Sequence, residues 1–230
     1  MNIEIIKETK DYIIINKPSG LTVHKANEGY PEATLVDFLI EKYPEIKNVG
    51  ESELRPGIVH RLDKETSGLM IIARTQEGFL YFKDLFKERK ITKKYLGLVH
   101  GNIYSDIIIE NKIGRSRSNK SKFCVTDSEK AKEAVTEIKV IQNYKKFCLI
   151  EATIKTGRTH QIRIHMQSIS RYIAGDKIYK PKSVKIPNKL NRTFLQAYYL
   201  EFIDIYGEKQ KIKIGLEEEL KNFLKTLENE

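Results

Sequence analysis

A histidine, an arginine and an aspartate fall within four positions, His60 to Asp63, between two apolar runs. Ile58 and Val59 precede this cluster, and the run 69–73 that follows it suits a buried strand. An isolated loop aspartate most often caps a turn, and a neighbouring arginine could pair with it at the surface. The density of the cluster instead favours a functional loop that buried segments hold in place.

A second cluster brings Arg158, His160, Arg163 and His165 into eight residues. Gly157 precedes it, and we expect this glycine to let the backbone turn tightly. The two histidines are five residues apart and have no cysteine or acidic ligand set beside them, so the pattern does not favour a metal site. We therefore expect hydrogen-bond donors here and no metal.

The charge balance indicates a polyanionic partner. The 230 residues carry a formal net charge of +10, with an isoelectric point near 9.3. Nucleic acid is a better match than a membrane surface for such an excess. A lysine-rich but inert surface is the alternative, and clustering argues against it, because the stretches 111–122 and 180–192 contain no acidic residue. Both are predicted to be loops, and they carry Lys112, Arg115, Arg117, Lys120, Lys122, Lys180, Lys182, Lys185, Lys189 and Arg192.

Composition places the chain among soluble globular proteins. No apolar run reaches the roughly 18 residues of a membrane span, and residues 1–4 lack the features of a secretory signal. The two cysteines, Cys124 and Cys148, are expected to be reduced. These features predict a cytoplasmic protein without membrane association.

Hydrophobic spacing predicts more strands than helices. Residues 34–43, with Thr34 as N-cap, residues 77–89, 159–167 and 216–227 are expected to be helical. Pro18 and Gly20 predict a turn before another short strand, Ser67 and Gly68 predict a turn, and 44–55 should be irregular. Other strands are predicted at 3–6, 12–15, 69–73, 94–99, 107–109, 122–125, 134–140, 147–154 and 194–202.

The fold class that follows is α+β with a large mixed or antiparallel sheet. Many of the predicted strands are neighbours in sequence, and neither an internal repeat nor a linker interrupts the chain. We expect residues 1–230 to form one domain.

Three segments together resemble the RluA-type pseudouridine synthases. The resemblance is carried by His-Arg-Leu-Asp-Lys-Glu-Thr-Ser-Gly-Leu from His60, by Lys-Lys-Tyr-Leu-Gly-Leu-Val from Lys93, and by Gly-Arg-Thr-His-Gln-Ile-Arg from Gly157. Asn-Lys-Pro-Ser-Gly-Leu from Asn16 and Gly-Asp-Lys-Ile-Tyr from Gly175 also resemble family segments, and we interpret the latter as structural.

The resemblance implies a bent sheet flanked by helices with a basic cleft, and conversion of uridine in RNA to pseudouridine without cofactor or metal. It implies that Asp63 is the catalytic residue, as nucleophile or as base. Tyr95 is expected to stack on the base, and Arg163 to keep the Asp63 carboxylate ionised, with Arg158 as the fallback. In many relatives a small RNA-binding domain precedes the catalytic one, and we expect none here.

Other residues are expected to bind the RNA. Arg61 would fill the space that the flipped base leaves. The remaining predicted RNA contacts are His60, Arg158, His160, Lys112, Arg115 and Arg117.

The segments around Asp63 are most similar to members that modify large-subunit ribosomal RNA, and transfer RNA is the alternative substrate. We expect the protein to be a monomer. The alternatives to a synthase are a non-catalytic RNA-binding protein and a hydrolase with Asp63 as base. The hydrolase would need a second acid or a metal set, which the sequence lacks.

Overall fold

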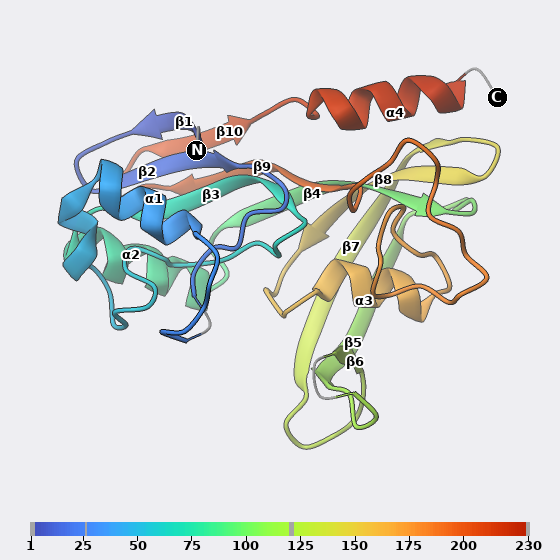
Figure 1. Cartoon of the computed structure of the whole chain (residues 1–230), viewed down its shortest axis with the longest axis horizontal. Helices are drawn as coiled ribbons and strands as arrows, with labels where there is room; N and C mark the ends of the chain where they lie inside the picture. Colours follow the sequence, from blue (N-terminus) through green and yellow to red (C-terminus); the bar gives the residue numbers. More distant parts are fainter. Residues whose placement is uncertain (1–2, 26, 120–121, 229–230) are drawn as a thin grey trace. The chain divides into compact units, whose positions relative to one another are not determined.

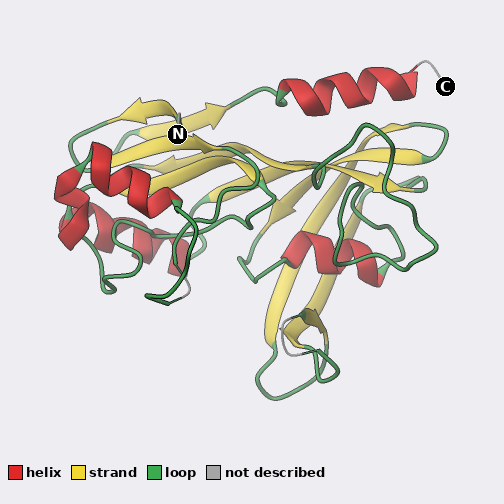
Figure 2. Cartoon of the chain, viewed as in Figure 1, coloured by secondary structure: helices red, strands yellow, loops and turns green. Residues whose placement is uncertain are grey.

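The computed structural model describes residues 3–25, 27–119 and 122–228. Figures 1 and 2 show the elements that these residues form. The helices are α1 (Leu35–Lys42), the 3₁₀ helix η1 (Pro44–Asn48), α2 (Gln76–Lys87), α3 (Gln161–Ser168) and α4 (Glu218–Glu228). The strands are β1 (Glu4–Glu8), β2 (Tyr12–Lys17), β3 (Ser67–Ala73), β4 (Thr92–His100), β5 (Ile107–Arg115), β6 (Phe123–Val125), β7 (Lys132–Asn143), β8 (Phe147–Ile154), β9 (Leu195–Ile203) and β10 (Lys209–Lys213).

The chain divides into two compact units. Unit 1 comprises the described part of Met1–Ile91 together with Tyr199–Ile214. Unit 2 comprises Thr92–Tyr198 and the described part of Gly215–Glu230. Each unit therefore contains segments that lie far apart in the sequence, and β9 begins in unit 2 and ends in unit 1.

Unit 1 is built on the antiparallel strands β1, β2 and β3, and β10 pairs antiparallel with β9. Every residue of β3 is buried, and the isoleucines 13–15 of β2 have no exposed surface. β-Branched side chains pack well on a pleated surface that is covered on both faces. Helix α2 supplies Phe82 and Leu85 to the core that Ile14 and Ile71 share. Strands β2 and β3 hold the loop that carries His60 to Asp63.

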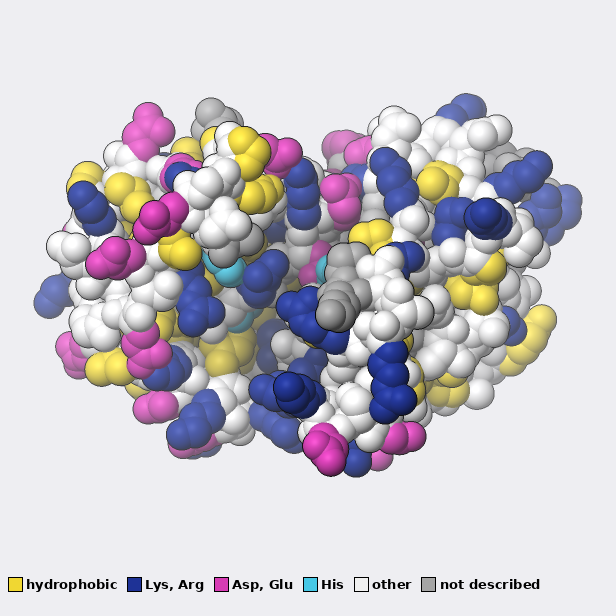
Figure 3. Space-filling view, turned by 60° about the horizontal axis from the view of Figure 1, so that its bottom comes forward, with side chains coloured by type: hydrophobic (Ala, Val, Ile, Leu, Met, Phe, Trp, Pro, Cys, Tyr) yellow, Lys and Arg dark blue, Asp and Glu magenta, His cyan; other side chains and the backbone are white. Residues whose placement is uncertain are grey.

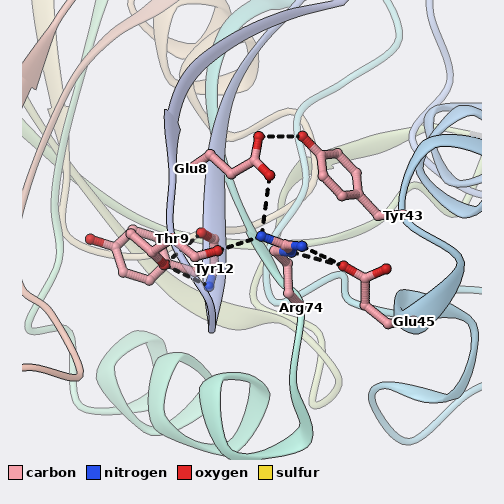
Figure 4. A network of polar contacts seen from close by, with 6 residues as sticks. All are labelled: Glu8, Thr9, Tyr12, Tyr43, Glu45 and Arg74. Atoms are coloured by element: carbon pink, nitrogen blue, oxygen red, sulfur yellow. Dashed lines mark hydrogen bonds and ion pairs between the residues drawn. The ribbon is translucent and has the colours of Figure 1, made fainter.

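Arg74 joins three segments of unit 1 (Figure 4). It follows β3 directly, and its Nε and Nη2 donate to Glu45 of η1 at 2.9 and 2.6 Å. Its Nη1 donates to Glu8 at 3.2 Å and to the carbonyl of Thr9 at 2.6 Å, and its guanidinium lies 4.9 Å from the ring of Tyr43. This network fixes one end of β3.

Unit 2 contains the antiparallel strand order β4-β8-β7-β5-β6. Helix α3 contacts β5, β6 and β7. Helix α4 buries one face, through Leu220, Phe223 and Leu227, in a cluster that includes Phe147 and Leu149. The remaining face of α4 carries charged residues, as an amphipathic helix requires.

Most of the predicted elements are confirmed, including α1. Thr34 is its N-cap and forms a capping box with Asp37, in which each side chain bonds to the backbone of the other residue. The prediction of loop structure for 180–192 is confirmed, and that for 111–122 is wrong in part, because β5 extends to Arg115.

Other predictions are wrong. No strand follows the turn at Gly20; residues 21–25 are irregular. Ser67 and Gly68 already belong to β3, and the turn lies at 64–65. The region 44–55 begins with η1, whose Ile46 is fully buried.

Candidate functional site

The loop that carries Asp63 is anchored to the turn that follows β2. Gly20 N donates to the carbonyl of Lys64 at 2.8 Å, and Ser19 Oγ donates to the carbonyl of Glu65 at 2.7 Å. Gly20 adopts a φ of 81°, which favours glycine. Asp63 itself is half-buried. These two hydrogen bonds to the carbonyls of residues 64 and 65 therefore restrict where the Asp63 carboxylate can lie.

Lys17 is the centre of this anchor. Its side chain has no exposed surface, and its Nζ donates to the carbonyls of Pro18, Leu21 and Lys64 at 2.8, 2.9 and 3.2 Å. A buried ammonium group is costly unless its three donors are satisfied, and these carbonyls satisfy them. Lys17 is not among the residues predicted from sequence to form the site. It lies in the segment Asn-Lys-Pro-Ser-Gly-Leu, whose resemblance to the family could have indicated a role.

His60 is held inside unit 1. Its Nε2 accepts a hydrogen bond from Ile71 N of β3 at 2.9 Å, and its ring stacks on Phe86 with centroids 4.5 Å apart. These contacts favour a role in positioning the loop. The predicted contact of His60 with RNA stays a prediction.

Arg61 is exposed beside His24. Its Nη1 lies 3.4 Å from His24 Nε2. Burial, followed by the charges of Arg61 and Arg55, lowers the pKa of His24. A neutral imidazole can accept a hydrogen bond from the guanidinium. His24, which no sequence pattern indicated, is therefore a direct neighbour of the loop that carries Asp63.

Tyr95 and Lys93 lie on the same face of β4 in unit 2, because they are two residues apart on a strand. Both are buried, with exposed fractions of 7% and 8%. Burial lowers the pKa of Lys93 to about 8. Tyr95, the predicted active-site tyrosine, is thus buried on β4 beside a lysine whose pKa lies well below the usual value for lysine.

Arg163 lies on α3 and is fixed by Asp176. Its Nε and Nη2 donate to the two carboxylate oxygens of Asp176 at 2.7 and 2.9 Å. Asp176 also accepts from Ile178 N at 2.7 Å and Tyr179 N at 3.0 Å. Burial raises the pKa of Asp176, but the hydrogen bonds and charge of Arg163 outweigh it and hold that pKa below its usual value. The segment that contains Asp176 thus positions Arg163, in agreement with its structural interpretation.

The backbone before α3 differs from the expectation for Gly157. Gly157 does not adopt a left-handed φ, and a Cβ at this position would meet nothing within 4 Å. The left-handed residue is His160, with a φ of 56°, immediately before α3. Gln161 then joins the segment to β7 through Nε2, which donates to the carbonyl of Val135 and to Thr136 Oγ1.

Three of the predicted RNA-binding arginines line one hollow in unit 2, with a volume of about 820 Å³. Arg115 is the last residue of β5, Arg117 lies two residues beyond it, and Arg158 comes from the segment before α3. The Arg115 guanidinium lies 5.0 Å from the ring of Phe123 on β6, which lines the same hollow. Lys130 and Lys132 also line it, together with Asp127 and Glu129.

The space-filling view looks onto the end of unit 2 that carries β5 and β6, where Lys and Arg side chains are numerous (Figure 3). Arginines beside an aromatic ring can contact both phosphates and bases.

The other predicted RNA-binding residues of unit 2 lie elsewhere. Lys112 does not line the hollow, and its Nζ lies 3.7 Å from Glu133 Oε1. His160 Nδ1 lies 2.7 Å from Tyr179 Oη. Lys120 falls outside the described residues.

Asp63 belongs to unit 1, whereas Tyr95 and Arg163 belong to unit 2. That the three side chains share one active site stays a prediction. Within the ranges that the structure describes, no group of three or more His, Cys, Asp or Glu could hold a metal ion. No helix formed by these ranges has both the length and the apolar character needed to cross a membrane.

Residues 11–168 match the family model described as RNA pseudouridylate synthase. Because the match covers more than half of the chain, the protein belongs to this family. The matched range includes the Asp63 loop, Tyr95 and Arg163.

Curated relatives agree with this assignment. An "Uncharacterized RNA pseudouridine synthase" from Aquifex aeolicus is 40% identical, over 87% of this chain and 65% of the relative. A "Ribosomal large subunit pseudouridine synthase D" from Borreliella burgdorferi is 36% identical, over 99% of this chain and 68% of the relative. The chain thus spans about two thirds of the length of these relatives.

Solved structures show the same fold. "Human RNA Pseudouridylate Synthase Domain Containing 1" aligns with a TM-score of 0.76 at 24% identity, over 100% of this chain and 96% of that one. "Human RNA Pseudouridylate Synthase Domain Containing 4" also gives 0.76, over 98% and 93%. The predicted α+β pseudouridine synthase fold is therefore confirmed.

Proposed function

We propose that this protein converts specific uridines to pseudouridine in structured RNA, with large-subunit ribosomal RNA as its substrate. The family match over residues 11–168 carries the proposal. Several relatives bear the name ribosomal large subunit pseudouridine synthase D, which supports the substrate. The arginine-lined hollow of unit 2 and the net charge of +10 support an RNA partner.

The proposed reaction is an isomerisation. The bond between ribose C1′ and N1 of uracil breaks, the base rotates, and C5 bonds to C1′. C5 loses a proton and N1 gains one, so nothing is oxidised and no cofactor is required. Asp63 acts on the ribose, either as nucleophile at C1′ or as base at the neighbouring carbon.

The other residues are assigned to binding and positioning. In this proposal Tyr95 stacks on the flipped base and takes the C5 proton, and Arg163 keeps the Asp63 carboxylate ionised. Arg61 fills the space that the base leaves in the RNA. In this proposal the enzyme works as a monomer in the cytoplasm.

Mapping pseudouridines in total RNA with and without the gene tests the proposal. We expect loss at one or a few uridines in loops of large-subunit ribosomal RNA, where bases are already partly unstacked. Loss confined to transfer RNA would overturn the substrate and leave the chemistry standing. No loss in any RNA would contradict the enzymatic function and favour an RNA-binding protein.

A further inference from the structure

The lysine-rich segment 180–192 lines a second hollow in unit 2, with a volume of about 680 Å³. Residues 183–189 form one side of it, and Phe223, Thr226 and Leu227 of α4 form another. His100 at the end of β4 and Lys146 and Phe147 at the start of β8 complete the lining. It shares no residue with the arginine-lined hollow. We call it the lysine pocket.

The wall of the lysine pocket is apolar and partly aromatic. The rings of Phe147 and Phe223 meet edge to face with centroids 6.3 Å apart, and the His100 ring lies 4.9 Å from that of Phe147. Ile186 and Pro187 contribute half-buried apolar surface from the segment itself. A volume of this size is typical of pockets that hold small ligands, and an apolar wall with aromatic side chains suits a nucleobase.

The segment 180–192 is fixed by an internal hydrogen bond and by packing against the core of unit 2. Lys180 Nζ donates to the carbonyl of Val184 at 2.6 Å, which closes a turn within the segment. Leu190 is 2% exposed and belongs to the same core cluster as Phe147 and Phe223. A pocket with fixed walls loses less entropy when it binds a ligand.

The charge of the lysine pocket is entirely positive. Lys146, Lys185 and Lys189 are exposed at it, and none of the residues that line it is acidic. Burial, followed by the charge of Lys180, lowers the pKa of His100, so this imidazole is neutral at pH 7. The pocket thus offers cations for an anion and uncharged surface for a base.

We propose that the lysine pocket binds one nucleotide of the substrate RNA other than the uridine that is modified. The base lies against Phe147, Ile186 and Pro187, and its phosphate pairs with the lysines at the rim. This inference rests on the proposed function insofar as the partner is RNA. It gives the 180–192 segment, which lies outside the segments that resemble the family, a role in substrate binding.

The test compares two triple variants that lose the same charge. One replaces Lys146, Lys185 and Lys189 by glutamine, and the control replaces Lys10, Lys47 and Lys87, which are exposed, lie outside the 180–192 segment and line neither hollow. The probe is large-subunit ribosomal RNA from a strain without the gene. Relative to the control, we expect affinity to fall about tenfold, as for the loss of a charged hydrogen bond. The slope of log affinity against log salt should shrink by about 0.7 to 0.9, the value for one phosphate.

A crosslinking measurement gives an independent readout. The same RNA substituted with 4-thiouridine should crosslink to the peptide that contains 183–189. Equal effects of the two triple variants, or no crosslink to that peptide, would overturn the proposal. It would also be overturned if polyglutamate bound wild type and lost that binding in the lysine-pocket variant while RNA binding was unchanged, since the partner would then be an acidic protein segment. A pocket-dependent loss of RNA binding in a protein that makes no pseudouridine would support the pocket and reject only the proposed catalysis.

Discussion

At the residue scale, the ion pair between Arg163 and Asp176 shows how unit 2 prepares a charged side chain. The two side chains are 4% and 0% exposed, so their charges are withdrawn from water. The bidentate geometry and the two backbone donors to Asp176 compensate for that desolvation. The orientation of Arg163 is therefore set by a residue thirteen positions further along the chain.

We expect Asp176→Asn to reduce the free energy of unfolding by about 3–5 kcal/mol, because it removes the carboxylate from a buried pair. Urea unfolding of the variant and of wild type measures this. Asp127→Asn, at an exposed aspartate, is the control and should change stability by less than about 0.5 kcal/mol. Equal stability of all three proteins would mean that the pair contributes nothing.

His165 should make stability depend on pH. It has no exposed surface, its Nδ1 lies 2.8 Å from Thr136 Oγ1, and burial lowers its pKa to about 4. The unfolded chain, with an ordinary histidine pKa of about 6.5, then binds more protons than the folded chain between these two values. The contribution of His165 to stability is full above pH 6.5 and is lost as the pH falls toward 4.

The free energy of unfolding of wild type should therefore fall as the pH is lowered through this window, and His165→Asn should reduce that dependence. Unfolding by urea at a series of pH values and constant ionic strength checks the expectation. An identical dependence in both proteins would show that His165 does not titrate differently in the folded state.

At the scale of elements, the turn 17–21 is a brace for the loop that carries Asp63. Both lie in unit 1, and the brace consists of Lys17, Ser19 and Gly20, each bonded to a carbonyl at 64 or 65. The loop has few buried apolar residues of its own, apart from Leu62. Its conformation therefore depends on these hydrogen bonds.

Lys17→Met tests the brace, because methionine fills a similar volume without the ammonium group. We expect a loss of about 1–3 kcal/mol in unfolding free energy, from carbonyls left without a donor. Under conditions where the variant is still folded, pseudouridine formation should also slow. Lys10→Met, at an exposed lysine, should do neither. A variant that is destabilised but still folded and forms pseudouridine slowly would support the brace, whereas wild-type stability and wild-type rates would contradict it.

The elements that sequence patterns predicted are those with a strong periodic signal. Buried isoleucines predicted β2 and β3, and Thr34 predicted the start of α1. Strand β10 reads Lys-Gln-Lys-Ile-Lys, which is too polar to indicate a strand, and its pairing with β9 supplies the missing stabilisation. The cationic end of β5 is likewise too polar to indicate a strand, and its pairing with β6 and β7 supplies the stabilisation.

The motifs could supply the residue types of the candidate site but not their partners. Arg158 is about forty positions from Arg117, and only the fold of unit 2 brings them to one hollow. Likewise, nothing in the spacing of Arg163 and Asp176 indicates a bidentate pair. Such contacts depend on tertiary packing, which local patterns do not encode.

At the scale of the whole molecule, the positive charge should dominate RNA affinity. Replacing Arg115, Arg117 and Arg158 together by glutamine should reduce the slope of log affinity against log salt by about 2 to 3, if each contacts one phosphate. Filter binding to large-subunit ribosomal RNA over a range of salt measures the slope. A triple Lys10, Lys47 and Lys87 to glutamine variant is the matched control. The same slope in both variants would show that the arginines are merely solvated.

The central claim is that Asp63 isomerises uridine in large-subunit ribosomal RNA. It is tested most directly by complementing a gene-deletion strain with wild type or Asp63→Asn and mapping pseudouridines in the RNA. The amide replaces one carboxylate oxygen at constant size, so fold and RNA binding should persist while the nucleophile or base is lost. We expect wild type to restore the missing pseudouridines and Asp63→Asn to restore none. Full restoration by the asparagine variant would contradict the account.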